Sequence, residues 1–541
     1  MDFNTYLGQK GYTILKNELT IEQQKQLRND LTIKPFSLRE CSLINNDQKT
    51  FPAYRESSNK FYVPHYYGVE KYGPPKEYKI SEGTDIVLEF AGKLRDGQVP
   101  VVETYINHVK RVNYGGGLLE LPCAFGKTCL ALNIISCLKK KTFIIVHKEF
   151  LMNQWIERIH QFLPKARIGK IQGPTIDIDD KDIVIGMLQS LSMKEYPASV
   201  FESFGLTIID EVHHISSEVF SNSLFKLVTK YMLGLSATMN RKDGTTNVFK
   251  MFLGDVIFKG KRDEEREVTV RAIEYKVDDD DFNEVKLDYR GNVAYSTMIS
   301  KLCEYNRRSE FILKILTDMF QENPSQQIMV LAHNKNILKY LHDAIKHKNI
   351  ATVGYYIGGM KEQALKETEG KQVVIATYAM AAEALDIKTL TTLIMATPKT
   401  DIEQSVGRIL REKHSNPIVV DIVDSHDTFK NQWRKRKTFY KKENYKIIYT
   451  TSQQYNPDTS NWTVVFTPNP NGPKVCNKSD KIDKSDKKNK KNTSTKSNSS
   501  SDKSIANDTD DDDDENDEIS IEDQKPKDKY LPGVCLLKFK K

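Results

Sequence analysis

Two series of short, uninterrupted apolar runs constrain the fold of this chain more than any other feature. The first series reads KTFIIVH, KDIVIGM, LTIID and YMLGLSAT and lies between residues 141 and 238. The second reads QQIMVLAH, KQVVIAT, LTTLIMAT and NPIVVDIV and lies between residues 326 and 423. Such runs are typical of strands that are buried on both faces, and longer amphipathic stretches separate them. The pattern predicts an α/β fold with two tandem parallel-sheet domains.

The same pattern sets the expected domain boundaries. We expect an N-terminal accessory domain over residues 1–84, a first α/β domain over 85–262 and a second over 263–455. Residues 456–541 are expected to form a low-complexity, mostly disordered tail, because Lys, Ser, Asn and Asp dominate them. The aromatic stretch at 51–75 matches no chemical motif, and we interpret its tyrosines as core and turn residues rather than platforms for nucleic-acid bases.

Composition narrows the class of protein. Apolar residues make up 39% and charged residues 28% of the chain, and no apolar run approaches the ~18 residues of a membrane span, so we expect a soluble protein with no membrane partner. The start MDFNTYLGQK lacks the apolar core of a signal peptide, and the cysteines form no C-x-x-C pair, which favours a reducing, cytoplasmic or nuclear compartment. The net charge of +7 includes an acidic run at 508–518, so the remainder is more basic and favours a polyanionic partner.

The stretch LELPCAFGKTCL at 119–130 ends like a nucleotide-binding loop. A full phosphate loop reads G-x-x-x-x-G-K-[ST], and its backbone amides and lysine hold the phosphates. Gly126, Lys127 and Thr128 match this pattern, whereas Leu121 occupies the first glycine position. On its own this partial match fits a turn between a strand and a helix equally well.

Two carboxylates strengthen the nucleotide interpretation. The run LTIID places Asp210 and then Glu211 at the carboxyl end of an expected strand, where parallel sheets bind ligands. In phosphoryl transfer, one carboxylate holds Mg²⁺ and a neighbouring group orients or deprotonates the attacking water. Asp210 suits the first role and Glu211 the second. With Lys127 upstream in the same domain, they predict a site for Mg²⁺ and ATP.

A pair of arginines follows in the second domain. The run DIEQSVGRILR at 401–411 contains Arg408 and Arg411, which share one face if the segment is helical. Surface helices often carry such a pair. Beside a phosphate site, however, the pair predicts arginine fingers that reach from the second domain to the transferring phosphate.

Taken in order, these motifs resemble those of superfamily 2 helicases and translocases. They read LRDGQ, LPCAFGKT, TFIIVHKEFLMNQW, MLQSL, DEVHH, LSATMNRKDG, IMVLAH, VVIATYAMAAEALDI and QSVGRILR, between Leu94 and Arg411. LSATMNRKDG and QSVGRILR look most like the XPB-like translocases and the helicases of large cytoplasmic DNA viruses, including the poxvirus transcript-release helicase. They look less like DEAD-box RNA helicases. The resemblance implies two RecA-like domains that use ATP and Mg²⁺ to move on or unwind nucleic acid, with DNA favoured over RNA.

The resemblance also implies the residues of the nucleotide site. The nucleotide-binding set is expected to be Gln98, Pro122, Cys123, Ala124, Phe125, Gly126, Lys127, Thr128 and Asp386. The expected catalytic set is Asp210, Glu211, Gln404, Arg408 and Arg411, and Thr128 and Asp210 are the expected Mg²⁺ ligands. Gln98 would read the adenine edge. Ala124 replaces the glycine that XPB-like loops carry in L-P-C-G-x-G-K-T, which costs on the order of 1 kcal/mol if this position has a left-handed backbone.

Nucleic-acid contacts are implied in the same way. The expected backbone-contacting residues are Lys148, Gln189, Ser190, Arg241 and Thr377. Trp155 is interpreted as helix packing rather than base stacking. The basic stretch QWRKRKTFYKKENYK at 432–446 either extends the nucleic-acid track or is a solvated helix face, and the residues leave both interpretations open.

Several alternatives remain at this stage. An RNA helicase is compatible with the core motifs, and so is a scaffold that binds ATP without turnover. A nuclease-coupled restriction motor is less favoured because no separate carboxylate-lysine nuclease signature is evident. We expect a monomer whose tail is a solvated linker, with recruitment of a protein partner or competition for the nucleic-acid groove as alternatives. Lysine- and asparagine-rich usage, together with the motifs, suggests a large DNA virus and hence a viral factory or virion.

Overall fold

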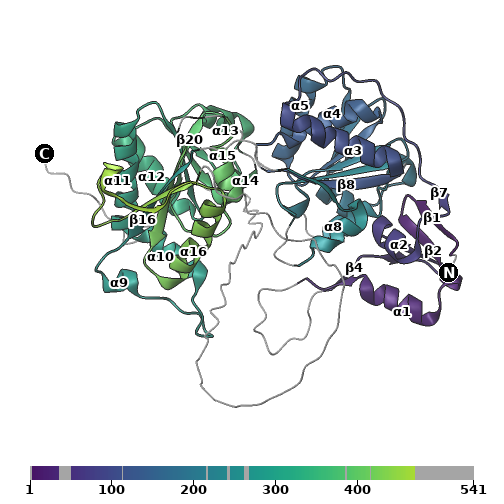
Figure 1. Cartoon of the computed structure of the whole chain (residues 1–541), viewed down its shortest axis with the longest axis horizontal. Coiled ribbons are helices and arrows are strands. Elements are labelled where there is room, and N and C mark those ends of the chain that lie inside the picture. Colours follow the sequence, from purple (N-terminus) through teal and green to yellow (C-terminus); the bar gives the residue numbers. More distant parts are fainter. Residues whose placement is uncertain are drawn as a thin grey trace, which may run out of the picture.

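The computed structural model describes residues 3–469 apart from residues 36–49, 113, 123, 215–216, 240–243, 261–266, 384, 386, 413 and 415. Figure 1 shows two large α/β domains side by side, with a small N-terminal unit packed against the first of them. The expected tail lies outside the described residues from 470 onward. So do three of the expected site residues, Cys123, Arg241 and Asp386.

An eight-stranded sheet forms the first α/β domain, in the order β11-β10-β12-β9-β13-β14-β8-β15. Its strands are β8 (Gly115–Glu120), β9 (Thr142–Val146), β10 (Ile168–Gln172), β11 (Thr175–Asp177), β12 (Ile183–Met187), β13 (Leu206–Ile209), β14 (Tyr231–Ser236) and β15 (Val256–Lys259). Every neighbouring pair is parallel except β10 with β11. The helices are α3 (Val99–Val112), α4 (Lys127–Leu138), α5 (Glu149–Phe162), α6 (Leu188–Met193), α7 (Ser217–Leu224) and α8 (Thr246–Leu253), with short 3-10 turns η2 (Asp96–Gln98), η3 (Ala198–Val200) and η4 (Val212–His214).

A second eight-stranded sheet, in the order β18-β19-β17-β20-β21-β16-β22-β23, forms the other domain. Its strands are β16 (Thr269–Tyr275), β17 (Gln327–Ala332), β18 (Val353–Tyr356), β19 (Val373–Thr377), β20 (Leu390–Met395), β21 (Ile418–Asp424), β22 (Lys446–Thr451) and β23 (Thr463–Phe466). Only β22 and β23 pair antiparallel, and β23 extends the sheet beyond residue 455. The helices are α9 (Asp280–Asn283), α10 (Tyr295–Glu304), α11 (Asn306–Glu322), α12 (Lys335–His347), α13 (Glu362–Glu369), α14 (Tyr378–Glu383), α15 (Glu403–Arg408) and α16 (Asp427–Lys442), with the 3-10 turn η5 (Thr459–Asn461).

Both large sheets are buried on both faces, as the uninterrupted apolar runs predict. Within β8, Leu118 packs into the hydrophobic cluster on one face and Leu119 into the cluster on the other. In β17, Val330 and Leu331 are divided between two clusters in the same manner. Successive side chains of a strand point to opposite faces, so a strand between two helical layers needs apolar residues at every position. The predicted fold class, two tandem parallel-sheet α/β domains, is confirmed.

The N-terminal unit shares its core with the first α/β domain. Its five-stranded sheet has the order β5-β6-β2-β1-β7. The strands of this sheet are β1 (Thr5–Gly8), β2 (Gly11–Leu15), β5 (Arg55–Glu56), β6 (Lys60–Val63) and β7 (Glu77–Tyr78). The unit also contains the strand pair β3 (Thr32–Ile33) and β4 (Phe51–Pro52), the turn η1 (Lys16–Glu18), and the helices α1 (Ile21–Asp30) and α2 (His65–Tyr72). Buried Phe61 and Tyr67 belong to the same cluster as Phe252 of α8. The Tyr66 hydroxyl donates to the carbonyl of Gly116 in β8. Tyr67 is therefore a core residue, as the sequence predicts for the tyrosines of this stretch, and Phe61 is a core residue as well.

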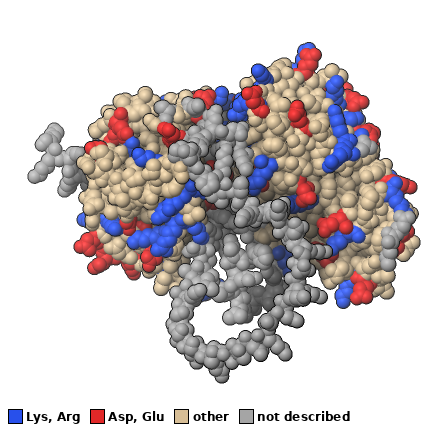
Figure 2. Space-filling model, in the orientation of Figure 1, with Lys and Arg blue, Asp and Glu red and all other residues tan. Residues whose placement is uncertain are grey.

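Charged side chains of both signs are spread over the face of the molecule seen in Figure 2, with one dense group of Lys and Arg over α16 in the second domain. That helix has the sequence DTFKNQWRKRKTFYKK. Its inner side is anchored by Arg436, whose guanidinium makes two hydrogen bonds of 2.8 Å to the buried carboxylate of Asp421. No helix in the described residues is long and apolar enough to cross a bilayer.

A second buried ion pair holds the core of the same domain and yields a stability prediction. Arg308 on α11 makes hydrogen bonds of 2.6 and 2.8 Å to Asp424 at the end of β21, and both side chains are fully buried. Arg308→Met is expected to lower the free energy of unfolding of this domain by about 3–5 kcal/mol, because it leaves Asp424 charged and unpaired in the core. Denaturant titration measures the change. Arg308→Met combined with Asp424→Leu is the control and should recover most of the loss, whereas a fully stable single variant would contradict the account.

Candidate nucleotide-binding site and domain interface

The phosphate loop connects β8 to α4 in the middle of the first sheet. Gly126 has a left-handed backbone (φ 90°) and precedes α4, whose first residues are Lys127 and Thr128. A Cβ at position 126 would lie 2.5 Å from Nε2 of Gln98, so only glycine fits there. The first N–H groups of an α-helix have no partner within the helix, so the N-terminus of α4 beside this loop is suited to bind phosphate.

Ala124 has a left-handed backbone, with φ 65°. This satisfies the condition under which the sequence predicts a cost for replacing glycine. A Cβ in this region is crowded against the backbone, which costs roughly 1–2 kcal/mol per residue. The loop keeps its shape because two side chains hold its carbonyl groups. Gln98 donates to the Phe125 carbonyl at 2.7 Å, and the Arg95 guanidinium donates to the carbonyls of Ala124, at 3.2 Å, and Phe125.

Gln98 is thus placed beside the loop rather than at its open side. Its amide nitrogen is bonded to the Phe125 carbonyl, its amide oxygen accepts the Arg95 backbone N–H at 2.9 Å, and the side chain is buried. To read an adenine edge, it would have to exchange these bonds for bonds to the base. The sequence did not single out Arg95, although it lies within the quoted LRDGQ motif.

The two carboxylates after β13 have different environments. Asp210 is buried, and burial raises the pKa of its carboxyl, with the negative charge of Glu211 adding to the rise and Lys127 opposing it. The indole N–H of Trp155 donates to Asp210 at 2.9 Å, and the backbone N–H of Glu211 donates at 3.0 Å. Both bonds hold the Asp210 side chain in one orientation.

Trp155 is therefore more than a packing residue. It is buried in the core of the first domain, as the sequence predicts, but its indole also ends at the Asp210 carboxylate. A tryptophan has one polar atom, and it usually finds a partner when the ring is buried. The helical pattern of NQWIERI predicts the burial, whereas the partner lies just after β13, far away in sequence.

Glu211 forms an ion pair with Lys127 across the loop, and its backbone is left-handed (φ 47°). The Lys127 ammonium and the Glu211 carboxylate are in direct contact. A nucleotide phosphate entering the loop must compete with Glu211 for Lys127. The strained backbone at Glu211 lies at the end of β13, where the chain turns into η4.

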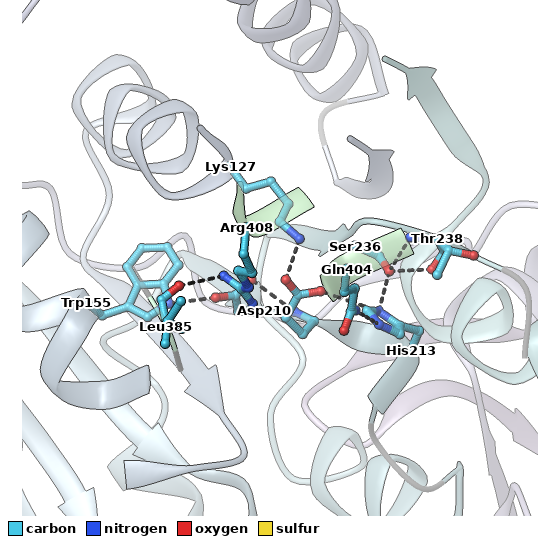
Figure 3. A network of polar contacts seen from close by, with 10 residues as sticks. Lys127, Trp155, Asp210, His213, Ser236, Thr238, Leu385, Gln404 and Arg408 are labelled. Atoms are coloured by element: carbon cyan, nitrogen blue, oxygen red, sulfur yellow. Dashed lines mark hydrogen bonds and ion pairs between the residues drawn. The ribbon is translucent and has the colours of Figure 1, made fainter. Parts of the chain in front are cut away.

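His213 connects the first domain to the second (Figure 3). Its Nδ1 lies 2.7 Å from the Ser236 hydroxyl, and that hydroxyl donates to the Thr238 carbonyl. The Ser236 oxygen must then accept a hydrogen bond from the Nδ1–H of His213, which in the neutral tautomer leaves Nε2 with a lone pair. Gln404 on α15 donates its amide N–H to this Nε2 at 2.9 Å. His213 lies in the motif DEVHH and Ser236 in LSATMNRKDG, but the sequence does not reveal that the two side chains contact each other and connect to Gln404.

Gln404 and Arg408 come from α15 in the second domain and belong to the same polar network as Lys127, Asp210 and His213 (Figure 3). Arg408 is 8% exposed and donates from Nη1 to the Leu385 carbonyl at 2.9 Å. Burial raises the pKa of Tyr356 to about 12, and the positive charges of Arg408 and Arg411 oppose the rise. Both arginines therefore lie near Tyr356, at the end of β18.

Two further polar contacts cross the domain interface. Asn153 on α5 donates to Glu362 on α13 at 3.0 Å, and Lys366 of α13 pairs with Glu157 of α5 at 2.8 Å. The Lys366 and Glu157 side chains are exposed, so this pair contributes little to stability. The contacts show that α13 and α5 face each other across the domain interface.

The expected nucleic-acid residues are found in both domains. Lys148 precedes α5, and Gln189 and Ser190 begin α6, so all three follow the neighbouring strands β9 and β12. Gln189 donates to the His147 carbonyl at 2.7 Å, and the Ser190 hydroxyl accepts the Gly173 N–H at 2.9 Å. Thr377 ends β19 in the other domain.

Replacing Ala124 by glycine tests the backbone strain in the loop. Ala124→Gly is expected to raise the free energy of unfolding by about 1 kcal/mol, because glycine adopts positive φ without crowding. Thermal denaturation measures the change, and a fluorescent ATP analogue should bind at least as tightly as before. Ala131→Gly, in the buried interior of α4, is the matched control and should lower stability by about 1 kcal/mol. Equal losses from both substitutions would contradict a strained loop.

Comparison with known proteins identifies the family. Residues 91–241 match the family model described as Type III restriction enzyme, res subunit. A protein of Acanthamoeba polyphaga mimivirus, provisionally named ATP-dependent RNA helicase L396, is 34% identical over 457 residues, which cover 82% of this chain and 87% of that protein. A protein of African swine fever virus, isolate Pig/Kenya/KEN-50/1950, provisionally named ATP-dependent RNA helicase QP509L, is 27% identical over 389 residues, with 66% and 74% covered.

Among solved structures, the helicase domain of Hef from Pyrococcus furiosus aligns with 65% of this chain and 100% of its own, at 13% identity and a TM-score of 0.43. The extent and identity of the mimivirus match, over both α/β domains, decide the family. The chain belongs to the superfamily 2 ATP-dependent helicases that include these viral proteins, and it is a nucleoside-triphosphate hydrolase that acts on nucleic acid.

Proposed function

We propose that this chain is a DNA motor in which the two α/β domains close on ATP and reopen after hydrolysis. The observation that carries the proposal is the continuous polar path from Lys127 through Glu211 and His213 to Gln404, which joins the phosphate loop to the second domain. A phosphate that binds Lys127 would change the ion pair between Lys127 and Glu211. Because His213 contacts both Glu211 and Gln404, that change reaches the second domain directly.

Phosphate binding would rearrange the ion pair. Lys127 and the N–H groups at the start of α4 would bind the phosphates, with Pro122, Cys123, Ala124 and Phe125 shaping the loop. Lys127 would then leave Glu211, whose carboxylate becomes available to orient and deprotonate the attacking water.

Asp210 and Thr128 would hold the Mg²⁺ ion. The described residues contain no group of three or more His, Cys, Asp and Glu side chains that could hold a metal. This suits Mg²⁺ at a nucleotide site, where it needs only one or two protein oxygens and takes its other ligands from water and phosphate. When bound, Mg²⁺ supplies charge neutralisation for the phosphate oxygens. Trp155 and the Glu211 N–H would keep the Asp210 carboxylate aimed at that position.

The second domain would complete the site. Arg408 and Arg411 would act as arginine fingers, after Arg408 exchanges the Leu385 carbonyl for phosphate oxygens. Gln404 and Asp386 would line the nucleotide site from this side, and Gln98 would read adenine from the other. Support comes from the placement of α15 against His213, since a small rotation about this contact moves both arginines relative to the loop.

The nucleic-acid backbone would run over both domains. Lys148, Gln189 and Ser190 would contact it from the first domain and Thr377 from the second, with Arg241 as a further contact. Closure would shift these two sets relative to each other and move the strand by a step. Binding through the backbone should weaken with salt and show little sequence preference.

An RNA substrate is the second candidate, because the viral relatives carry the name of RNA helicases. A scaffold that binds ATP without turnover is the third, and the strained Ala124 is the feature that favours it. We further propose that the chain acts as a monomer, in the cytoplasm or nucleus, or in the viral factory or virion if its source is a large DNA virus like those of the relatives. The tail beyond residue 469 would recruit a protein partner.

Hydrolysis assays with different polymers test the proposed substrate. We expect duplex or single-stranded DNA to stimulate ATP hydrolysis by the full chain more than RNA does. Lys127→Ala should abolish hydrolysis because it removes the phosphate ligand, and Glu211→Gln should lower it by a factor of about 10²–10⁴ because it removes the base. Stimulation by RNA alone would establish the RNA helicase, and no hydrolysis with any polymer would overturn the motor and leave the scaffold.

Trp155→Phe tests the proposed positioning of Asp210. The substitution keeps an aromatic ring but removes the N–H donor, and removing such a supporting hydrogen bond typically costs 10–100-fold in metal affinity or activity. We expect about tenfold more Mg²⁺ to be needed for half-maximal binding of a fluorescent ATP analogue, and likewise for hydrolysis. Trp433→Phe is the matched control, since Trp433 packs in the second domain and its indole makes no hydrogen bond to the described part of the chain. Equal Mg²⁺ requirements in the two variants would rule out the positioning role.

A further inference from the structure

The solvent-facing side of α16 is a rigid, strongly basic surface that the proposed site does not use. Its exposed or half-buried cations are Arg434, Lys435, Lys437, Lys441 and Lys442, and we call this set the α16 basic face. Figure 2 shows a dense group of Lys and Arg side chains over the second domain, in the region of α16. Among the residues that the structure describes, no carboxylate pairs with Arg434, Lys437, Lys441 or Lys442.

Such a cluster does not stabilise the helix. Residues three and four apart are neighbours on a helix surface, so Arg434, Lys437 and Lys441 repel one another. Stability of α16 comes instead from the opposite side, where Arg436 and Tyr440 bind buried Asp421. The helix is thus held firmly while it presents uncompensated positive charge, which favours a polyanionic ligand.

We propose that the α16 basic face binds the sugar-phosphate backbone of the nucleic acid on which the motor moves, as an additional contact outside the helicase motifs. This inference rests on the proposed function and adds a surface to it. Arg434 to Lys441 span about 10 Å of helix, which is close to the axial length of four successive phosphates of one strand at about 3.4 Å per step. Three cations in a row along one side can therefore meet about three phosphates.

Contacts within the second domain connect this face to the expected track. The Lys399 ammonium lies 5.3 Å from the ring centroid of Tyr378, the residue after Thr377. The Lys399 carbonyl in turn accepts a hydrogen bond of 3.1 Å from Arg436. Thr377, Lys399 and α16 therefore lie in neighbouring parts of the same domain.

The chain's own acidic run at 508–518 is the competing polyanion. Asn469, where the described part of the chain ends, is hydrogen-bonded to Asn444 just beyond α16, so the tail leaves beside this helix. However, a lysine-rich stretch at 474–491 lies between Asn469 and the acidic run and supplies counter-charges nearer to it. Nucleic acid, whose charge is continuous, is the occupant that the described surface fits better.

The test compares two charge-matched variants of the full chain. One carries Arg434→Gln, Lys437→Gln and Lys442→Gln, and leaves Lys441 in place because it lies over the Phe466 ring of β23. The control carries Lys339→Gln, Lys346→Gln and Lys348→Gln, three exposed lysines on or just after α12 in the same domain. Thermal denaturation should show that both variants are folded, and ATP hydrolysis without polymer should be unchanged in both.

Binding of a fluorescently labelled DNA duplex is then measured over a range of salt concentrations. The α16 variant is expected to bind about tenfold more weakly at low salt. The slope of log K against log salt concentration should become less negative by about 0.9 for each phosphate contact removed. The control should bind like the unaltered chain. Equal binding and equal slope in the two variants would overturn the inference, while polymer-stimulated hydrolysis of the unaltered chain would show that the proposed motor function still holds.

Neutralising the acidic run distinguishes nucleic acid from the tail as the ligand of the α16 basic face. In the full chain with Asp510 to Asp514 replaced by Asn, the α16 substitutions should still weaken duplex binding by the same factor. If the tail occupies α16 instead, the Asp→Asn change alone should tighten duplex binding, and the α16 substitutions should have no additional effect. That outcome would replace nucleic acid by the tail as the ligand of this surface.

Discussion

The ion pair between Lys127 and Glu211 is the interaction on which the account of this molecule depends. It joins the loop after β8 to the turn after β13, two strands that are separated only by β14 in the sheet. In the proposed mechanism the lysine binds phosphate and the glutamate acts on water. Because the two side chains neutralise each other in the ion pair, a triphosphate would have to separate them before hydrolysis.

In the proposed mechanism, contacts of His213 carry this change to the second domain. Glu211 and Gln404 both contact His213, whose tautomer is fixed by Ser236. Because the imidazole is neutral, its Nε2 can only accept a hydrogen bond, and the Gln404 amide must keep its N–H groups turned toward the first domain. The domain contact is thus short, directional and connected to the catalytic carboxylate. A contact of this kind can be remade with every nucleotide cycle without rearranging either hydrophobic core.

Much of the fold and of the candidate site could be predicted from the sequence. The rest could not be predicted, and the reasons are physical. The strands follow from apolar runs such as TFIIV, because burial on both faces leaves a local signature. Glycine-lysine-threonine after a strand and Asp-Glu after another fix the nucleotide site, since parallel strands end at one edge of a sheet. By contrast, Trp155 reaches Asp210 and Arg95 reaches the loop carbonyls through contacts between residues distant in sequence. The residues around Trp155 and Arg95 in the sequence do not indicate these partners. From the sequence, a left-handed backbone at Ala124 could only be assumed in order to state its cost, because the presence of an alanine does not indicate a positive φ.

A high-resolution structure of the full chain with Mg²⁺ and a non-hydrolysable ATP analogue tests the central claim most directly. The account predicts that Lys127 leaves Glu211 for the phosphates, that Arg408 leaves the Leu385 carbonyl, and that Arg408 and Arg411 both approach the terminal phosphate while Gln404 stays at the domain interface. Retention of the Lys127–Glu211 pair with nucleotide bound, or both arginines pointing away from the phosphates in the closed form, would contradict it.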